Sequence, residues 1–386
     1  MTGGIGAMEE VGIGMLGAGF IGQMHSLSFT TARYAMTTPA VQARLVALAE
    51  RDEGQSLAQE VQRRYGWEEV YLDDWSPVVG HDGVDLFINS GPNDAHLEPT
   101  IAAMRNGKHV FCEKPLARTA DEAYRLWQES AEAGVIHMCA YLHRFIPSLR
   151  LARQMIRAGE IGDVLHFRSN FLLDMREPDR SLTWRFSQSV AGGGAVGDLG
   201  SHHIDQARYL VGEVRRVAAM TTTWSEDTAG RIRDVNDDAF SAIAELDNGA
   251  TATFEGSRVP GGHTLTGRIE VDGTKGTLAF SMERLNELTV TQGRTGPRTI
   301  LVAGGNDPFG RFWLPVGIQG AHPAGWRDCF AYQAHHMLSA VQHGTHIGPE
   351  GATFEDGYKV AEIVDTILRS AQSGRFEEVT YLPAPG

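Results

Sequence analysis

The first third of the chain alternates short apolar runs with segments in which apolar residues recur at helical spacing. This rhythm is typical of parallel strands joined by crossover helices, because such a sheet is covered on both faces. The expected strands are 11–16, 44–49, 84–89, 109–112 and 136–140. The expected helices are 21–30, 53–65, 96–106 and 120–133. The pattern predicts a doubly wound α/β domain of the Rossmann type over residues 1–145.

Beyond Pro147 the pattern changes to longer β-like runs with few helices between them. After an expected helix at 148–157, the expected strands are 164–171, 214–223, 239–245, 250–258 and 276–280. Successive strands without crossover helices indicate a large, mostly antiparallel open sheet. Helices expected at 326–342 and 354–370 end an α+β domain over residues 146–386, and we expect the last helix to pack back on the first domain.

Two loops in the second domain are longer than simple connections need to be. They span residues 174–189 and 302–325. Loops of this length are often functional lids or disordered segments.

Charge and cysteine usage narrow the classes of function. With 34 Lys and Arg against 48 Asp and Glu, the net charge is -14, and this balance argues against nucleic acid or an anionic membrane as partner. The three cysteines, Cys112, Cys139 and Cys329, are odd in number and far apart, so reduced thiols are expected. The first ten residues do not resemble a signal peptide, and no run reaches the ~18 apolar residues of a membrane span. We expect a cytoplasmic protein.

A glycine-rich loop follows the first expected strand and opens the first expected helix. It reads Gly17-Ala18-Gly19-Phe20-Ile21-Gly22. Gly17 allows a tight turn, Gly19 lets the backbone approach a pyrophosphate, and Gly22 lets helix and strand pack closely. The alternative is a glycine-rich turn without a ligand, but the strand and helix on either side favour dinucleotide binding, with Phe20 and Ile21 in the same loop.

The end of the second strand indicates which dinucleotide is bound. A carboxylate at Glu50 can accept hydrogen bonds from both ribose hydroxyls and would repel the extra phosphate of NADP, so it favours NAD. Arg51 beside it keeps NADP as the alternative cofactor. Glu50 could also be a solvated strand end.

The segment 192–205, GGGAVGDLGSHHID, carries the strongest chemical signal. If its second half is helical, Asp198 and His202 share a face, while His203 is rotated by about 100°. Oxidation of an alcohol needs a base for the hydroxyl proton, and imidazole, with an ordinary pKa of ~6.5, can accept it near neutral pH. The alternative is a helix-capping Asp198 and a packed His202.

A lysine at the end of a strand in the first domain supports the catalytic interpretation. Glu113-Lys114-Pro115 follows the strand that ends near Cys112. Ligands of open α/β sheets bind beyond the carboxyl ends of the strands, so Lys114 would face the reacting groups and could donate to an oxygen on which charge develops. A surface lysine is the alternative.

Together these motifs resemble the Gfo/Idh/MocA oxidoreductases, which include glucose-fructose oxidoreductase and inositol dehydrogenases. The resemblance covers essentially the whole chain: the glycine loop, Gly91-Pro92-Asn93 with His96, Glu113-Lys114-Pro115, and the segment ending in Asp198 and His202. It implies that Lys114, Asp198 and His202 are catalytic, and that Pro92, Asn93, His96 and Glu113 lie near the cofactor. It also implies a homodimer or homotetramer.

Within that family the chain is similar to levoglucosan dehydrogenases and other enzymes that oxidise the position-3 hydroxyl of pyranose rings with NAD. The similarity rests on Leu182-Thr183-Trp184-Arg185-Phe186, the run 205–213 and the late His335. It implies substrate contacts at Trp184, Arg185 and His335, and further candidates are His143 and Arg144. Where many members have Asn, this chain reads Leu142, so His143 either lines the pocket or only caps its turn.

Three arginines precede the glycine-rich segment: Arg176, Arg180 and Arg185. They could bind an anionic group on the substrate, or they could be solvated beside Glu177 and Asp179. His335 and His336 are adjacent on an expected helix, where their side chains diverge, and no carboxylates accompany them, so no metal is expected.

The leading hypothesis is an NAD-dependent dehydrogenase that acts on a ring hydroxyl of a sugar, glycoside or cyclitol. The second is an NAD-dependent glycosidase that oxidises position 3 only transiently and releases the aglycone by elimination, for example from an anionic sulfoquinovoside. A catalytically silent NAD-binding regulator would require a lost catalytic residue, and Lys114, Asp198 and His202 are all present.

Overall fold

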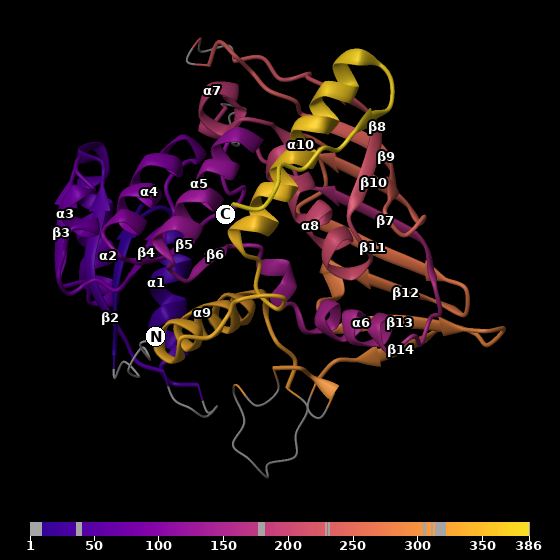
Figure 1. The fold of residues 1–386 in the computed structure, drawn as a ribbon, viewed down its shortest axis with the longest axis horizontal. Coiled ribbons are helices and arrows are strands. Elements are labelled where there is room, and N and C mark those ends of the chain that lie inside the picture. Colours follow the sequence, from indigo (N-terminus) through magenta and orange to yellow (C-terminus); the bar gives the residue numbers. More distant parts are fainter. Residues whose placement is uncertain are drawn as a thin grey trace.

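The computed structural model describes residues 10–35, 41–176, 182–227, 230, 232–303, 306–309, 312 and 322–385. The chain forms two sheets with helices around them (Figure 1). The first sheet has six parallel strands in the order β3-β2-β1-β4-β5-β6. This is the predicted Rossmann arrangement.

Every strand and helix expected in the first domain is present. The strands are β1 Val11–Leu16, β2 Ala43–Glu50, β3 Glu69–Leu72, β4 Leu86–Asn89, β5 His109–Cys112 and β6 His137–Cys139. The helices are α1 Phe20–Ala32, α2 Gln55–Tyr65, α3 Ser76–Val79, α4 Leu97–Arg105 and α5 Ala120–Ala133. Only the edge strand β3 and the single-turn α3 were not predicted, since β3 is only partly buried and has no continuous apolar run.

The second sheet has nine strands in the order β14-β13-β12-β11-β7-β10-β9-β8-β15. They are β7 Val164–Leu172, β8 Val214–Thr222, β9 Ala239–Leu246, β10 Thr251–Ser257, β11 Thr266–Gly273, β12 Gly276–Ser281, β13 Glu287–Gln292, β14 Arg298–Leu301 and β15 Glu377–Glu378. Only β7 and β10 pair in parallel, so the predicted, mostly antiparallel α+β domain is confirmed. Strands β11, β13, β14 and β15 were missed.

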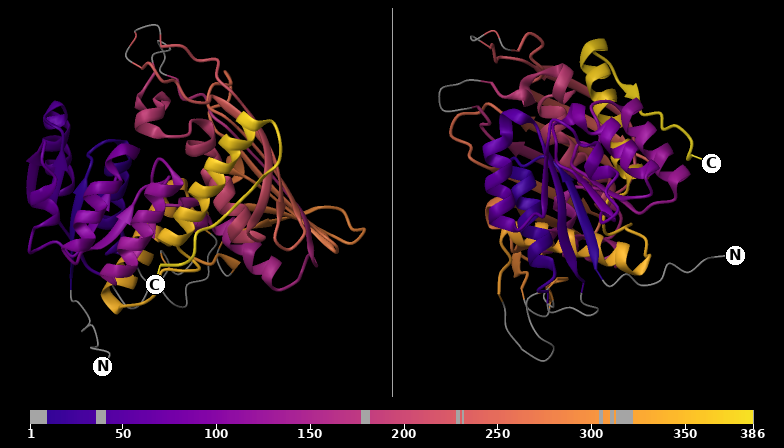
Figure 2. Two further views of the ribbon diagram at one scale, coloured as in Figure 1. Left: turned by 45° about the horizontal axis from the view of Figure 1, so that its top comes forward. Right: turned by 90° about the vertical axis from the view of Figure 1, so that its left-hand side faces the viewer.

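Helices of the second domain cover one face of this sheet and reach the first domain (Figure 2). They are α6 Pro147–Arg157, α7 Gln188–Ala191, α8 Ser201–Leu210, α9 Trp326–His343 and α10 Phe354–Ser373. Helix α9 packs on α1, and α10 packs on both α5 and β8. The C-terminal helices therefore join the two sheets.

The two long expected loops are described only in part. Within 174–189 the chain forms the short helices η4, Trp184–Phe186, and α7, so this stretch is more regular than predicted. Residues 304–305, 310–311 and 313–321 of the other loop lie outside the described residues. In the described part of the chain, no helix is long and apolar enough to cross a membrane, and no cluster of three or more His, Cys, Asp or Glu side chains could hold a metal ion.

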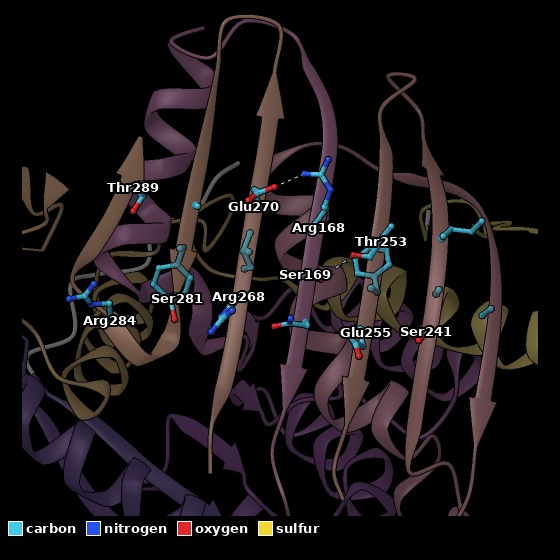
Figure 3. Close-up of a pocket in the computed structure, with 18 of the residues that line it drawn as sticks. Arg168, Ser169, Ser241, Thr253, Glu255, Arg268, Glu270, Ser281, Arg284 and Thr289 are labelled. Atoms are coloured by element: carbon cyan, nitrogen blue, oxygen red, sulfur yellow. Dashed lines mark hydrogen bonds and ion pairs between the residues drawn. The ribbon is translucent and has the colours of Figure 1, made fainter. Parts of the chain in front are cut away.

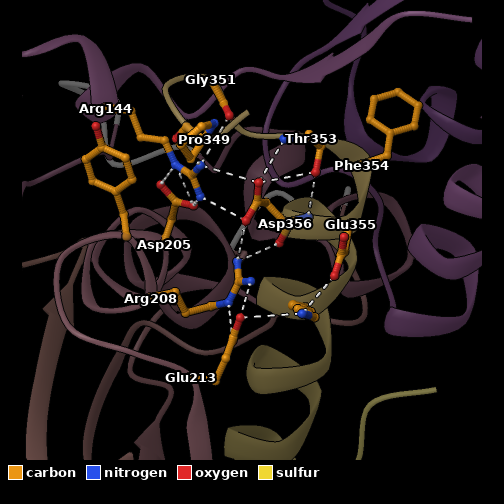
Figure 4. A network of polar contacts seen from close by, with 12 residues as sticks. Arg144, Asp205, Arg208, Glu213, Pro349, Gly351, Thr353, Phe354, Glu355 and Asp356 are labelled. Carbon is orange, nitrogen blue, oxygen red and sulfur yellow. Dashed lines mark hydrogen bonds and ion pairs between the residues drawn. The ribbon is translucent and has the colours of Figure 1, made fainter. Parts of the chain in front are cut away.

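A buried network of ion pairs connects the last Rossmann strand to α8 and α10 (Figure 4). Arg144 lies in η3, Leu142–Phe145, and only 3% of its side chain is exposed. Its guanidinium nitrogens lie 2.6 Å and 2.9 Å from the two carboxylate oxygens of Asp205, on α8, and 3.1 Å from Asp356, on α10. Arg208 of α8 also binds Asp356 and reaches Glu213.

Replacing Asp205 by Ala is expected to lower the free energy of unfolding by about 3 kcal/mol or more, because Arg144 would lose its bidentate partner while remaining buried. Urea unfolding of the two proteins measures the difference. The matched control is Glu60→Ala, which removes an exposed i,i+4 pair with Arg64 and should cost less than about 1 kcal/mol. Equal losses in the two variants would contradict a stabilising role for the buried network.

Candidate active site

The glycine loop has the geometry that dinucleotide binding requires. Gly17 has φ +98°, and a Cβ on it would lie 2.8 Å from the carbonyl oxygen of Ser90. A Cβ on Gly22 would lie 2.1 Å from the carbonyl oxygen of Gly17. A Cβ on Gly19 would meet no atom within 4 Å, so the space in front of this residue is open. The first turn of α1 contains no acidic side chain, and the positive end of the helix dipole there can attract phosphate.

Glu50 lies against this loop. Its Oε2 accepts a hydrogen bond from the backbone N–H of Ala18 at 2.7 Å, and its Oε1 accepts one from the N–H of Arg51 at 2.9 Å. The carboxylate is thus held at the loop, where a ribose would be bound, while the Arg51 side chain is exposed. Phe20, which is 66% exposed, and the partly buried Ile21 complete the loop, and the residues present fit a dinucleotide.

The loop that follows β4 links the two domains. Pro92 precedes the short helix η2, Asn93–Ala95, and the side-chain amide of Asn93 donates to the carbonyl of Ala191 at 2.8 Å. His96 is buried, with Nε2 3.1 Å from the carbonyl oxygen of Gly91 and Nδ1 3.0 Å from that of Pro115. Its imidazole therefore ties together the loops that contain the predicted cofactor residues.

Glu113 has a partner that sequence reasoning missed. Nε2 of His25, on α1, lies 2.8 Å from Oε1 of Glu113, and the other carboxylate oxygen accepts from the backbone N–H of Lys114 at 3.1 Å. Burial alone would raise the pKa of Glu113, but His25 and the charge of Lys114 lower it. The carboxylate stays ionised and fixes the turn from which Lys114 projects.

Lys114 and Asp198 meet across the domain boundary, as the sequence predicted for a shared site. The Lys114 ammonium donates to Oδ1 of Asp198 at 2.7 Å and to the carbonyl oxygen of the same residue at 2.9 Å. Burial opposes ionisation of Asp198, yet Lys114 and Arg185 lower its pKa. Oδ2 of Asp198 makes no hydrogen bond and lies 3.7 Å from Nε of Arg185.

The backbone that carries Asp198 is a π-helical turn, Val196–Gly200, which continues into α8. The sequence predicted a regular helix here. The start of the segment is held by Asp237, which accepts from the N–H groups of Gly194 at 2.6 Å and Val196 at 2.9 Å. A Cβ on Gly194 would lie 1.9 Å from the carbonyl oxygen of Asp237, so this contact needs glycine.

His202 lies among aromatic rings at the start of α8. The imidazole of His143 stacks on it, with ring centroids 4.2 Å apart and planes inclined by 18°. Tyr141 and Phe171 are its other ring neighbours. Burial, with His143 and Lys114 nearby, lowers the pKa of His202 well below its ordinary value, so the ring is neutral at pH 7.

The remaining candidates for substrate contact divide into two groups. His143, Trp184 and Arg185 lie at the cluster: His143 stacks on His202, and the guanidinium of Arg185 lies 4.5 Å from the ring centre of Trp184 while facing Asp198. Arg144 does not point into the site, because its guanidinium is enclosed between Asp205 and Asp356. We therefore correct its expected role to a structural one.

His335 lies on α9, where its ring packs edge-on against Phe312 with centroids 5.4 Å apart. This contact places His335 beside Phe312, and its expected role in substrate binding stays a prediction.

The expected arginine cluster is only partly described. Arg180, Glu177 and Asp179 lie outside the described residues. Arg176 forms a bidentate ion pair with Asp174 and also donates to the carbonyl of Val259. Of the two arginines in this cluster that the structure describes, Arg185 faces Asp198, whereas Arg176 is paired with Asp174.

A further arginine, which was not predicted from the sequence, supports the backbone of Arg185. Arg258 has a fully buried side chain, stacks on Phe186 at 3.8 Å, and donates to the carbonyl of Arg185 at 2.7 Å. Asn236 donates to the same carbonyl and to that of Gly192. These contacts fix the backbone of η4 beside the glycine-rich segment.

Comparison with known proteins agrees with this geometry. The family model described as "Oxidoreductase family, NAD-binding Rossmann fold" matches residues 11–141, and that of the GFO/IDH/MocA C-terminal domain matches residues 149–279. Over 98% of its length the chain is 34% identical to levoglucosan dehydrogenase of Pseudarthrobacter phenanthrenivorans, all of which is covered. It is also 31% identical to the scyllo-inositol 2-dehydrogenase (NAD(+)) of Bacillus subtilis, over 73% of this chain and 77% of that protein.

Solved structures extend the similarity to three dimensions. A levoglucosan dehydrogenase in complex with NADH and levoglucosan superposes with a TM-score of 0.88 at 34% identity, covering 96% of this chain and 100% of the other. The matches cover nearly the whole chain and confirm the resemblance drawn from the motifs. The protein therefore belongs to the Gfo/Idh/MocA family of oxidoreductases.

Proposed function

We propose that this protein is an NAD-dependent dehydrogenase that oxidises a ring hydroxyl of a sugar, glycoside or cyclitol. The observation that carries the proposal is the contact between Lys114 and Asp198 beside a neutral His202, opposite a loop whose residues fit a dinucleotide. The similar levoglucosan and scyllo-inositol dehydrogenases support the same class of reaction.

Each residue of the cluster has a distinct chemical task in this proposal. NAD, held by the glycine loop and Glu50, supplies the hydride acceptor when bound. The ammonium of Lys114 polarises the reacting oxygen, and Asp198 orients that ammonium. We place the hydroxyl proton on Nε2 of His202, because Nδ1 of this ring is buried without a hydrogen-bond partner.

We further propose that position 3 of a pyranose ring is the site of oxidation, with Trp184 and Arg185 as the side chains that face the sugar. An aromatic surface and a cation beside Asp198 suit a ring that carries several hydroxyls. A redox-neutral cleavage of an anionic glycoside is less well supported. Arg176, one of the arginines that would favour it, is bound to Asp174, and the relatives compared above are dehydrogenases.

The first experiment mixes the protein with NAD and a panel of pyranoses, cyclitols and neutral or anionic glycosides. Absorbance follows NADH, while chromatography follows glycoside loss in the same samples. We expect stoichiometric NADH and a ketone product. Aglycone release without net NADH would instead establish the redox glycosidase.

Lys114→Ala should lower kcat roughly 10²–10³-fold, because the group that stabilises charge on the reacting oxygen is removed. Binding of NAD, measured by calorimetry, should be unchanged. Lys108→Ala is the matched control, since Lys108 immediately precedes the first residue of β5 and, within the described residues, donates to the backbone carbonyl of His81. Full activity in the Lys114 variant would remove this residue from the mechanism.

Glu50→Ala should lower the preference for NAD over NADP, measured as the ratio of kcat/KM values, by roughly ten- to a hundredfold. The variant loses both a charge-assisted contact with the ribose and the repulsion of the extra phosphate. Glu53→Ala changes a nearby exposed carboxylate and serves as control. An unchanged ratio in the Glu50 variant would place the ribose contact elsewhere, and Arg51 would then be the residue to test for NADP binding.

We also propose that the protein forms a homodimer or homotetramer through the outer face of the nine-stranded sheet (Figure 3). Met220 and Ile243 are 64% and 51% exposed on the neighbouring strands β8 and β9, and they line the same hollow as a salt bridge between Arg168 and Glu270 on β7 and β11. An apolar patch with both charges beside it suits a self-complementary interface.

Light scattering coupled to gel filtration should therefore give a dimer or tetramer, and the double variant Met220→Glu/Ile243→Glu should reduce it to smaller species by burying unpaired charge. Leu382→Glu, at an exposed residue near the C-terminus, is the control. A monomeric wild-type protein would contradict the proposal.

A further inference from the structure

His143 packs directly against the imidazole of His202. Its ring is 4% exposed and lies nearly parallel to the His202 ring, at 4.2 Å between centroids. Phe171 of β7 touches both imidazoles, and its ring stacks on His203 with centroids 5.3 Å apart. The candidate base is thus one ring in a packed group of four that comes from three separate elements.

Titratable groups face His202 from several of the elements that pack on it. Lys114 faces it from the turn after β5, His143 from η3 and His203 from α8 itself. Asp198, from the π turn, is paired with Lys114. Phe171 and Tyr141 present uncharged rings. In the described residues, no carboxylate makes a hydrogen bond to either nitrogen of His202, so the ring is not held by the ionic partner that many catalytic histidines have.

Two imidazoles in face-to-face contact cannot both hold a proton without direct repulsion, especially where water is excluded. Burial lowers the pKa of His143 to about 3, with contributions from His203 and Lys114. His143 is therefore neutral in the resting protein. Its flat face, rather than a carboxylate, restrains the plane of the His202 ring.

We propose that His143 is a positioning residue for proton transfer. Its neutral ring holds the imidazole of His202 in the plane from which the base takes the hydroxyl proton, and it keeps water from that face. In the step it serves, the O–H bond of the substrate breaks and its proton moves to Nε2 of His202. The two electrons of the C–H bond leave as hydride to NAD, and a C=O bond forms. This inference rests on the proposed function and adds a residue to it.

The test compares His143→Phe with His143→Leu. Phenylalanine keeps a flat ring of similar size, whereas leucine keeps apolar bulk and removes the flat face. We expect the Phe variant to retain kcat and the shape of the wild-type pH profile. The Leu variant should lose roughly ten- to a hundredfold in kcat, because a misplaced base is far less effective. KM for the sugar and calorimetric NAD binding should change little in both.

The pH profile separates positioning from a merely structural role. A lowered pKa of His202 lets activity persist at acidic pH, and activity falls only when pH drops through that pKa. With leucine at 143, water can reach the face of the ring, so the pKa of His202 rises and the acidic limb of kcat/KM moves to higher pH. With phenylalanine the face of the ring stays covered, so the limb moves less than with leucine. Thermal melting of both variants identifies a loss of folding.

Controls distinguish failure of this inference from failure of the proposed function. His202→Ala should be inactive; if it retains turnover, the proposed function fails and this inference with it. If His202→Ala is inactive but His143→Leu matches the wild type in kcat and pH profile, His143 has no positioning role. Loss of kcat in the Phe variant equal to that in the Leu variant would also overturn the proposal, since it would assign the effect to a ring nitrogen.

A titration of the wild-type protein tests the surroundings of His202 directly. NMR of histidine-labelled protein, with His202→Ala used to assign the signal of that residue, should show His202 remaining neutral as pH falls through 6.5. A His202 signal that titrates near 6.5 overturns the proposal, because a ring enclosed by His143 would not take up a proton there.

Discussion

The active site depends on one buried arginine that belongs to neither the cofactor nor the substrate region. Arg144 closes the last segment of the Rossmann domain and binds Asp205 of α8 and Asp356 of α10. Burial opposes ionisation of Asp356, but Arg144 and Arg208 lower its pKa, so this carboxylate remains charged between the two guanidinium groups. A guanidinium held by two parallel hydrogen bonds restricts sliding and rotation of the segments that it joins. The helix that carries His202 is therefore fixed relative to the strand ends that carry Glu50 and Lys114.

Fixed domains allow the site to be assembled from both sides. Lys114 comes from the first domain and Asp198 from the second, and they meet at 2.7 Å with little exposure to water. Such a pair is strong only when its geometry is maintained, because both groups have lost most of their hydration. Its charges nearly cancel, and the adjacent His202 is neutral. In the proposed reaction, a proton on that ring would lie beside a cation, which favours its release after hydride transfer.

The sequence predicted those parts of the fold and site that are encoded locally. Strands β1, β2 and β4 are buried on both faces and read as continuous apolar runs, whereas β3 and β14 lie at sheet edges and lack that signal. Residue types and motifs identified Lys114, Asp198 and His202. Sequence could not show which way a guanidinium points, so Arg144 was expected at the substrate, although its partners lie 61 and 212 residues away.

The same limit explains the residues that sequence reasoning missed. His25 meets Glu113 across 88 residues, and Asp237 meets Gly194 across 43. Neither partner belongs to the local motif that it supports, and a buried histidine or aspartate carries no distinctive spacing. The motifs therefore indicated the candidate catalytic groups, while the groups that hold them became visible only in the fold.

This division has a consequence for substrate choice. Asp237 holds the glycine-rich segment through backbone N–H groups, and Arg258 holds the backbone of residue 185 through its carbonyl. Both anchors act on the main chain, so the side chains of Trp184 and Arg185 can differ without moving the segment that carries Asp198 and His202. In the proposed function, chemistry and specificity thus rest on separable sets of residues. A fold built this way can keep one hydride-transfer geometry while the ring that it accepts changes at a few side chains.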